Sequence, residues 1–475
     1  MKMKKIINAL YSKTEMLENI FTVIFLIYAI LSNNGLTYGR SIITPFMYAS
    51  FLLAVLLIGI RVLNCKKYFS MPLTVLSLLM VCSVGISTVL NRNHSFKDNA
   101  VFCIYWAIYF LIYVTTDKNK SRESCKKTLR IAGATFTVYT TVAVIASLVM
   151  YFAGVSETYI VENSDSSYYL GFVWGRLWGV FLNPNQGSIS CAISIMIFIY
   201  LIRKSKKLTY KILLCVNIFI HIIYMVFSDS RSGAVALSVA VAAYVFAGMV
   251  RNYDKKIGKQ VLSGVLAVCV AAACFVGVRQ LRKPVNLVIT AMDNCIDNNG
   301  NSDIGKEEEK NIIDRGYDLS EDVSNRRFDI WKSGLEIFAH SGKNMIFGVS
   351  FRGIVDYAKE NMPQTYIINN GYSVMRTFEN DLLNILVSNG VFGILCTMAF
   401  VVYALILVFK NFFKISKEEK YYAGVQLAII LELSVSAMFS AIMFYSFSPN
   451  SIIFWILLGQ MIAYFNAQEE PKREL

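Results

Sequence analysis

The sequence predicts an all-α polytopic membrane protein, with about twelve transmembrane helices and one long extracytoplasmic loop that contains an amphipathic helix. Hydrophobic residues make up 55% of the chain and charged residues 16%, whereas about a quarter of the residues in a soluble domain are charged. The apolar stretches suffice to cross a hydrocarbon core about 30 Å thick. They lack the alternation of a transmembrane strand, which favours helices over a barrel.

The predicted spans divide the chain into three parts of one integral membrane domain. Residues 1–279 hold the first nine spans, residues 280–379 form the long loop, and residues 380–475 hold the last three. The spans lie near residues 18–33, 41–63, 71–90, 98–116, 129–152, 185–202, 208–228, 232–250, 260–279, 381–409, 421–443 and 450–466. The basic start resembles a signal peptide, but no small-residue cleavage site follows, so we interpret the first span as permanent.

Basic residues are distributed unevenly between alternate connections. The formal net charge of +14 would by itself suit nucleic acid. Lys and Arg concentrate instead in connections such as 118–127, 203–207 and 410–420. The short intervening connections hold only Arg40, Arg92, Lys97, Arg176 and Arg231. This positive-inside bias predicts that both termini are cytoplasmic, that the long loop lies outside the cytoplasmic membrane, and that nucleic acid is not a partner.

The sequence predicts no cofactor and no metal. It has no glycine-rich phosphate loop and no cytoplasmic domain large enough to bind a nucleotide. Its three histidines, His94, His221 and His340, are far apart and lack metal-ligand spacing. Of ten cysteines, only Cys295 is expected outside, so one chain offers no external disulfide framework.

The long loop has two parts of different composition. Residues 293–322 are rich in Asn, Asp, Gly and Glu, which predicts a flexible surface excursion. After Asn325 the apolar residues recur at helical spacing, at Phe328, Trp331, Leu335 and Phe338. This pattern predicts an amphipathic helix on the outer surface of the bundle.

Three arginines at the predicted outer face are candidates for anion binding. Arg231 begins the eighth span after a short turn, and its planar guanidinium suits two phosphate oxygens. An interfacial arginine that reaches lipid phosphates is an open alternative. Arg327 starts the amphipathic helix and has a surface salt bridge as its alternative. Arg176 precedes an Asn-Pro-Asn turn, which has a structural alternative because Asn185 suits a helix N-cap.

Two carboxylates occupy positions of interest. Glu379 stands beside Asn380 where the chain re-enters the bilayer, and acids there also favour the positive end of a helix dipole, so capping stays an alternative to chemistry. Glu432 lies inside the predicted eleventh span, where a buried carboxylate is a functional candidate by default. It would suit a proton-coupled transporter, or it bonds a hydroxyl such as that of Ser434 or Ser436.

Four motifs, in this order, resemble the O-antigen polymerase and ligase superfamily, the Wzy-type membrane glycosyltransferases. They are residues 175–185 (GRLWGVFLNPN), 230–234 (SRSGA), 325–331 (NRRFDIW), and Glu379-Asn380 with 389–393 (NGVFG). The resemblance covers roughly residues 170–400. Ligases of this superfamily typically carry His-Asn where this chain has Glu379-Asn380, which favours a polymerase and leaves the identity of the base open.

The resemblance implies a glycan polymerase that uses undecaprenyl-diphosphate-linked repeat units at the outer face, for capsule, exopolysaccharide or O-antigen synthesis. The donor is already activated, so neither nucleotide nor metal is expected. We expect Arg231 and Arg327 to hold the diphosphate and Glu379 to orient or deprotonate the acceptor hydroxyl. The remaining members of the predicted substrate-binding set are Arg176, Arg326, Asn185, Asn380 and Trp331. Trp331, Tyr366 and Tyr372 either stack on sugars or pack the loop onto the bundle.

Further expected partners are the lipid bilayer and, as possibilities that the resemblance raises, a flippase and a chain-length regulator. Two rival functions stay open. A ligase of the same superfamily would pass the finished glycan to another acceptor, and the acceptor cannot be read from one sequence. A lipid-linked oligosaccharide flippase or proton-coupled exporter would also be rich in spans. Lys and Arg are almost absent from the span centres, which argues against a flippase, whereas Glu432 argues for a transporter.

Overall fold

The computed structural model describes residues 11–69, 72–160, 167–250, 257–297, 313, 326–371, 374–412 and 414–467. The helices before residue 250 are α2 (Thr14–Ser32), η1 (Ser41–Ile43), α3 (Thr44–Leu63), α4 (Cys65–Tyr68), α5 (Pro72–Leu90), α6 (Phe96–Ala107), η2 (Ile108–Val114), α7 (Arg122–Phe152), α8 (Pro184–Lys204), α9 (Leu208–Phe227) and α10 (Arg231–Val250). The later helices are α11 (Ile257–Gln280), α12 (Arg282–Asp297), α14 (Arg327–Ala339), α15 (Gly342–Phe347), α16 (Gly353–Asn361), α17 (Asp381–Phe412), α18 (Lys417–Ser436) and α19 (Pro449–Asn466). The strands are β1 (Ser156–Ile160), β2 (Ser167–Val173) and β3 (Arg176–Gly179).

Long apolar helices dominate the described part of the chain, which confirms the predicted all-α polytopic membrane fold. Ten helical segments of that part are long and apolar enough to cross a membrane. The predicted eleventh and twelfth spans correspond to α18 and α19, which are helical but more polar. The first turn of α18 carries Glu418 and Glu419, and α19 starts at Pro449-Asn450.

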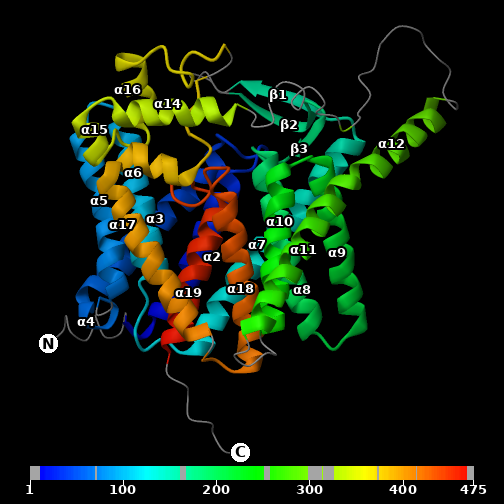
Figure 1. The fold of residues 1–475 in the computed structure, drawn as a ribbon, viewed down its shortest axis with the longest axis horizontal. Helices are drawn as coiled ribbons and strands as arrows, with labels where there is room; N and C mark the ends of the chain where they lie inside the picture. The colour runs from blue at the N-terminus through cyan, green and yellow to red at the C-terminus, as the bar shows by residue number, and fades with distance from the viewer. Residues whose placement is uncertain are drawn as a thin grey trace, which may run out of the picture. The chain divides into compact units, whose positions relative to one another are not determined.

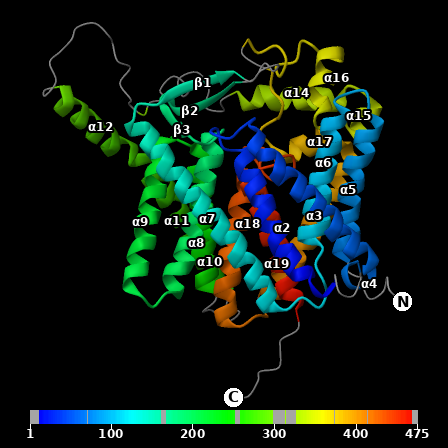
Figure 2. The same ribbon diagram turned by 180° about the vertical axis from the view of Figure 1, so that it is seen from behind.

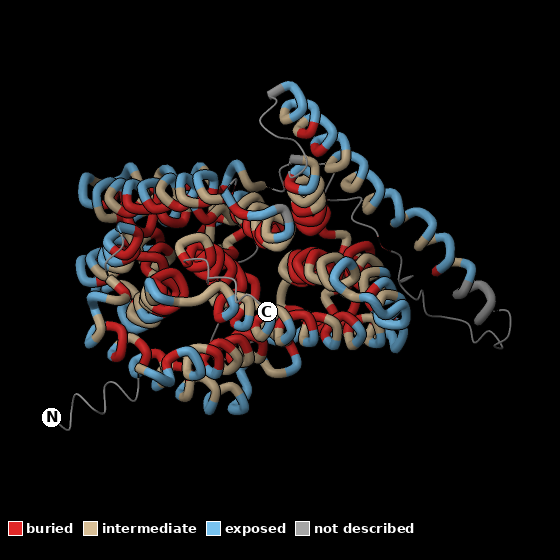
Figure 3. The backbone as a smooth tube through the Cα atoms, turned by 90° about the horizontal axis from the view of Figure 1, so that it is seen from below, coloured by how far each residue is buried: buried red, intermediate tan, exposed pale blue. Residues whose placement is uncertain are grey.

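The chain forms two compact units. The first unit comprises Met1–Asn33, Thr37–Phe136 and Arg326–Leu475, and the second comprises Asn34–Leu36 and Thr137–Asn325. Figures 1 and 2 show the helices of each unit from opposite sides. Within the helices, buried positions face inward and exposed positions lie on the outer faces (Figure 3). Outward apolar surface of this kind suits contact with lipid tails.

Aromatic side chains fill the core of the first unit. There α17 packs against α5, α15 and α19, and α19 packs against η2. The ring of Trp455 on α19 lies 5.8 Å from that of Tyr109 and 4.7 Å from that of Phe110. At one end of the unit, α14, α15 and α16 lie beyond the helix ends of α5 and α6 (Figure 1). These short helices bring the second half of the long loop to that end.

Helix α17 bends at Gly390, the second residue of the predicted NGVFG motif. Gly390 has φ +66° inside the helix. A Cβ at this position would lie 2.3 Å from the carbonyl carbon of Ile346 on α15, and the adjacent Asn389 accepts a hydrogen bond from Tyr445 at 2.7 Å. The motif therefore sets a close packing contact between α15 and α17.

The second unit is a helical bundle with a small sheet at one end. In it α8 packs against α9 and α10, and α10 packs against α11. The sequence predicted no strands, but β1, β2 and β3 form an antiparallel sheet in the order β1-β2-β3. Gly171 permits a bulge at the β2–β3 pairing: its φ is +79°, and a Cβ there would lie 1.9 Å from the carbonyl oxygen of Val155.

The long loop begins with a helix that the sequence analysis placed in hydrophilic loop. Helix α11 ends at Gln280, and α12 follows at once from Arg282 to Asp297. Figure 1 shows α12 leaving the end of α11 at an angle, away from α8 and α10. Most of the predicted flexible excursion, residues 298–312 and 314–322, lies outside the described residues.

The predicted span 421–443 is wrong at its end, because α18 stops at Ser436 and residues 437–448 are not helical. Side chains satisfy the backbone of this segment. Asp381 accepts hydrogen bonds from the amides of Ile442 and Met443 at 3.1 and 2.8 Å. The segment is apolar in sequence, so hydropathy alone predicts that the helix continues. Non-helical backbone inside a membrane protein is stable only where protein groups accept and donate its hydrogen bonds.

Candidate functional site

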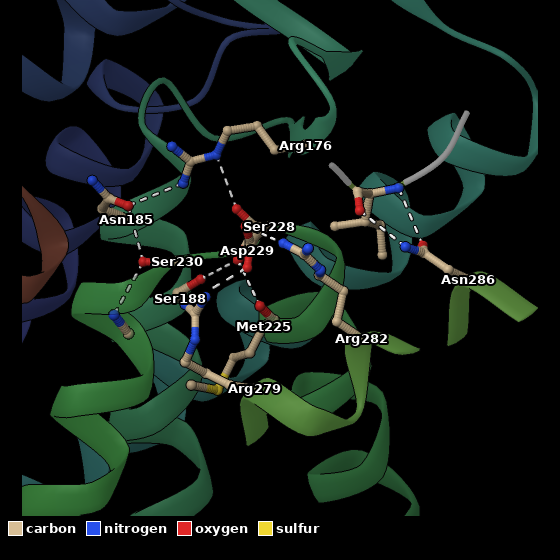
Figure 4. A network of polar contacts seen from close by, with 12 residues as sticks. Arg176, Asn185, Ser188, Met225, Ser228, Asp229, Ser230, Arg279, Arg282 and Asn286 are labelled. Carbon is tan, nitrogen blue, oxygen red and sulfur yellow. Dashed lines mark hydrogen bonds and ion pairs between the residues drawn. The ribbon is translucent and has the colours of Figure 1, made fainter. Parts of the chain in front are cut away.

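Arg176 is held against the turn between α9 and α10 in the second unit (Figure 4). It begins β3 and is buried, with 8% of its surface exposed. Its Nε donates to the carbonyl oxygen of Ser228 at 2.9 Å, and its Nη2 donates to Oδ1 of Asn185 at 3.0 Å. These bonds tie the sheet to the turn between α9 and α10, so the geometry suits a positioning role for Arg176.

Asn185 does not cap α8, so the capping alternative for this residue is wrong. The N-cap is Asn183, whose side chain accepts from the amide of Asn185 at 2.9 Å, and Pro184 occupies the first helical turn. The side chain of Asn185 is thereby released to accept from Arg176 and from the hydroxyl of Ser230 at 2.9 Å. One amide oxygen thus links β3 to the residue that precedes Arg231.

The turn that carries Arg231 is tightly braced. Ser228 and Ser188 share a hydroxyl hydrogen bond of 2.5 Å, and Ser230 accepts from the amide of Gly233 at 3.0 Å. Arg231 is the first residue of α10 and is partly buried. Hydrogen bonds therefore join Arg176 and Asn185 to the turn before Arg231 within the second unit. A helix start beside an arginine is a favourable place for an anion.

Asp229 pairs with two arginines that the sequence analysis did not select. Arg282 Nη1 lies 3.3 Å from Oδ2 of Asp229, and Arg279 Nη1 lies 3.8 Å from its Oδ1. Both arginines come from the junction of α11 and α12. The sequence placed them at the edge of an apolar run. Arg279 lies in the last turn of α11, and Arg282 is the first residue of α12.

Arg327 lies at the start of α14 in the first unit, as predicted. The alternative for Arg327 was a surface salt bridge to Asp329 or another neighbour. In the structure its Nη2 instead donates to the carbonyl oxygen of Phe439 at 3.1 Å. The guanidinium carbon also lies 5.8 Å from the centre of the Phe439 ring. Arg327 is thus anchored on the non-helical segment 437–448.

Glu379 lies in the same unit, close enough to Arg327 for their charges to interact. Its carboxylate accepts from the hydroxyl of Thr377 at 3.1 Å. Burial raises the pKa of Glu379 above its ordinary value of 4.5, and the Thr377 hydrogen bond and the charge of Arg327 offset this only in part. A carboxyl group with a raised pKa is better suited to take up a proton near neutral pH.

Asn380 caps α17 rather than Glu379. Its Oδ1 accepts from the amide of Leu383 at 3.0 Å, and its Nδ2 donates to the carbonyl oxygen of Met438 at 3.1 Å. The helix cap that was an alternative role for Glu379 is therefore provided by Asn380. Both Asn380 and Arg327 hold carbonyls of the non-helical segment.

Three residues of these clusters have left-handed backbone conformations that are costly for side chains other than glycine. Arg326 has φ +61°, Glu379 has φ +50°, and Asp229 has φ +43°. Such conformations cost about 1–3 kcal/mol and concentrate at functional sites. Arg326 also donates to the hydroxyl of Tyr366 at 3.3 Å.

The aromatic candidates of the loop mainly pack it against the unit. Trp331 donates from Nε1 to the carbonyl oxygen of Phe378 at 3.0 Å. The buried side of α14 is formed by Ile330, Ser333, Gly334 and Ile337, whereas Phe328 remains 69% exposed. Tyr372 lies outside the described residues. This arrangement agrees with the packing alternative for Trp331.

Three further polar residues of the first unit are notable. Arg352 and Asp381 were not predicted as site residues, and Glu432 does not bond the hydroxyl expected for it. Arg352 rests on the rings of Phe102 and Phe351 at 5.0 and 5.6 Å, and burial lowers its pKa. Asp381 holds the non-helical segment, as described above. Glu432 is fully buried, and neither carboxylate oxygen has a hydrogen-bond partner among the described residues. The hydroxyl of Ser434 donates to the carbonyl oxygen of Ile430 instead.

The residues around Arg231 in the second unit and around Arg327 and Glu379 in the first unit fall largely in one segment of the sequence. Residues 216–398 match the model of the O-antigen ligase family. This match confirms the resemblance to the O-antigen polymerase and ligase superfamily. The matched segment includes Arg231, Arg326, Arg327, Trp331, Glu379 and Asn380, whereas Arg176, Asn185 and the sheet precede it. The chain matches no curated protein.

Proposed function

We propose that this protein lengthens a surface polysaccharide by joining lipid-linked repeat units. The donor is a glycan on undecaprenyl diphosphate, the acceptor is a hydroxyl of an incoming lipid-linked unit, and the reaction takes place at the outer face of the cytoplasmic membrane. The product is a capsular polysaccharide, an exopolysaccharide or an O-antigen. The observation that carries the proposal is the O-antigen ligase match over a segment that contains Arg231, Arg327 and Glu379.

In the proposed transfer, the acceptor oxygen attacks the anomeric carbon of the donor glycan. The new glycosidic bond forms as the bond to the diphosphate oxygen breaks, and undecaprenyl diphosphate leaves with that electron pair. Glu379 takes the hydroxyl proton, a role that its raised pKa supports. Arg231 and Arg327 stabilise the charge that develops on the diphosphate, which removes the need for a metal ion.

The other members of the set have supporting roles in this proposal. Arg176 and Asn185 hold the turn before Arg231, as their hydrogen bonds to Ser228 and Ser230 suggest. Asn380 and Arg326 position the entry of α17 and the start of α14. Trp331 fixes the backbone that leads to Glu379 through its hydrogen bond to Phe378.

Polymerisation is preferred to ligation because Glu379-Asn380 stands where ligases of the superfamily typically carry His-Asn. The acceptor distinguishes the two functions. A polymerase uses a second lipid-linked repeat unit, whereas a ligase uses a different acceptor. The fully buried Glu432 is the observation that favours a transporter as the second candidate.

The test is a reconstitution in liposomes with undecaprenyl-diphosphate-linked repeat units, without nucleotide and with a chelator present. We expect a ladder of longer lipid-linked glycans. Arg231→Ala should lower the rate by about 10²–10³-fold, the loss typical of one preorganised charge-stabilising group. Arg92→Ala is the matched control, because Arg92 is an exposed arginine at the same predicted face and should leave the ladder intact.

Other outcomes of this assay would contradict the proposal. Transfer to a non-repeat acceptor without a ladder would indicate a ligase. Movement of intact lipid-linked units between leaflets, with no new glycosidic bond, would indicate a transporter. A normal ladder from Arg231→Ala would remove Arg231 from the diphosphate site while leaving the polymerase in place.

A further inference from the structure

We propose that the outward face of the β1–β2–β3 sheet binds sugar rings of the growing glycan. The face is formed by Tyr169, Trp174 and Trp178, which we call the aromatic face. The inference rests on the proposed function and adds a glycan subsite to it. No residue of the aromatic face belongs to the segment that matches the O-antigen ligase family.

The strand register separates the two faces of the sheet. Leu170, Phe172 and Leu177 are buried, with 4%, 8% and 0% of their surfaces exposed, so they face the helices of the second unit. Tyr169 lies between Leu170 and Tyr168 in β2 and therefore points to the opposite side. All five residues of β1 are exposed, which leaves the sheet open along this edge.

Three aromatic rings meet on the outward side. The ring of Tyr169 lies 4.8 Å from that of Trp178, at an interplanar angle of 58°. The ring of Trp174 stands perpendicular to Tyr169 at 6.4 Å, and Trp174 is 73% exposed. Trp174 is thus the exposed member, and Tyr169 and Trp178 are half-buried beside it. Tyr and Trp side chains offer an apolar ring face together with a polar edge. That combination matches a pyranose ring, which has an apolar C–H face and a hydroxyl rim.

Trp174 occupies a backbone position that costs stability. Val173 pairs with Arg176, so Trp174 and Gly175 form a two-residue hairpin turn, and their φ values are +57° and +66°. Positive φ at both positions defines a type I′ turn, which strongly prefers Asn-Gly. A large aromatic residue held in this conformation points to a use for the side chain rather than for the turn.

The charge of the sheet favours a glycan over a lipid surface. Elements that lie on membranes are rich in Lys and Arg, which attract anionic headgroups. The one basic residue in the three strands is Arg176, which is buried. Tyr169, Trp174 and Trp178 themselves carry no charge. The three strands therefore lack the exposed basic side chains that attract an anionic bilayer, whereas uncharged sugar rings do not need them.

The aromatic face also adjoins the proposed diphosphate cluster within the second unit. Trp174 lies in the hairpin turn that leads directly into β3, two residues before Arg176. Arg176 is hydrogen-bonded to Ser228 and Asn185 at the turn before Arg231. A lipid-linked glycan whose diphosphate lies at that turn would therefore present its sugars near the sheet.

The test measures binding of lipid-free saccharide to the full-length protein in nanodiscs of neutral phospholipid. The probes are oligosaccharides of one, two and four repeat units, prepared from the surface polysaccharide of the cell that makes the protein. Affinity is measured for each variant by isothermal titration calorimetry. Quenching of Trp174 is taken as the difference in tryptophan fluorescence between the unmodified protein and Trp174→Asn. We expect saturable quenching that strengthens from one repeat to four.

Trp174→Asn separates binding from folding, because it introduces the residue that the turn prefers. We expect an unchanged or higher Tm together with binding weakened by about tenfold or more. Tyr169→Ala should weaken binding similarly. Tyr159→Ala is the matched control: Tyr159 pairs with Tyr168 in the register and stacks on its ring at 5.2 Å, so it belongs to the opposite face. It should bind normally.

Two results would overturn the inference. One is equal saccharide affinity in the unmodified protein and Trp174→Asn. The other is quenching of Trp174 by brominated phospholipid, which would place the aromatic face in the membrane interface. Both are independent of the polymerase assay: a ladder with normal Trp174→Asn binding leaves the proposed function standing without this subsite. Saccharide binding without a ladder leaves the subsite standing without the polymerase.

Discussion

At the scale of single residues, Glu379 combines features that a catalytic carboxylate needs. Its φ of +50° is sustained by the surrounding structure, its carboxylate is oriented by the Thr377 hydroxyl, and Asn380 performs the capping that an acid there would otherwise supply. Burial and Arg327 act on its pKa in opposite directions, and burial dominates. The side chain is therefore held in place and tuned toward proton uptake.

The pH dependence of transfer tests this assignment. Only the deprotonated form of Glu379 accepts a proton, so activity should fall as the pH drops through its pKa. Because burial raises that pKa, the acid limb should have its midpoint above 4.5. Glu379→Gln should lower the rate by about 10²–10⁴-fold and abolish the acid limb. Rates measured in the liposome assay across the pH range, with Thr377→Val as a positioning control, decide the matter. A full rate for Glu379→Gln would exclude the base role.

At the scale of elements, the non-helical segment 437–448 organises the entry of α17. The amide of Asp381 donates to the carbonyl oxygen of Ala437 at 2.9 Å, and Asn380 and Arg327 hold the next two carbonyls. The hydroxyl of Ser451 and the indole of Trp455 both donate to the carbonyl oxygen of Met443, at 2.8 and 3.0 Å. A regular helix here would have consumed those carbonyls internally, and the side chains of Arg327 and Asn380 would have lost their anchors.

The kink of α17 gives the prediction at this scale. Gly390→Ala should destabilise the protein by at least about 1–3 kcal/mol, because the new Cβ adds strain at φ +66° and meets the backbone at Ile346. Gly85→Ala is the matched control, since Gly85 lies in α5 with open space around it. It should be neutral or slightly stabilising. Thermal unfolding in detergent measures both, and equal Tm values for the two variants would show that the kink is not required.

At the scale of the whole molecule, the uneven distribution of Lys and Arg predicts which end of each unit faces outward. The sheet, the Arg231 turn, α14 and the entry of α17 all lie at helix ends that this rule assigns to the outside. The proposed transfer at the outer face therefore requires that these helix ends lie outside the cytoplasmic membrane.

Labelling with a membrane-impermeant maleimide tests the orientation. In a background without the other native cysteines, Ser167→Cys should react in intact cells, because Ser167 is an exposed residue of β2. The exposed native Cys65, placed in an inner connection by the charge bias, should react only after permeabilisation. The reverse pattern would move the proposed active site to the cytoplasmic face.

The site residues were predictable from the sequence to different degrees. Arg231, Arg327 and Glu379 stand out because charged residues are scarce at the ends of apolar spans, and the superfamily motifs include them. Arg279, Arg282 and Asp381 gave no such signal, because their partners are distant in the chain or on an irregular segment. The capping alternative for Asn185 was wrong, since the choice between two asparagines around one proline depends on backbone geometry.

The sequence by itself determined the fold class and the approximate positions of the spans, because the cost of burying charge in lipid is read directly from local hydropathy. It also determined the family resemblance. Only the tertiary structure decided where α18 ends, that α12 continues the ninth span, and that a sheet lies before α8. Those features depend on hydrogen bonds between residues far apart in the chain, such as Asp381 to Met443 and Arg176 to Ser228. Local hydropathy contains no information about such partners.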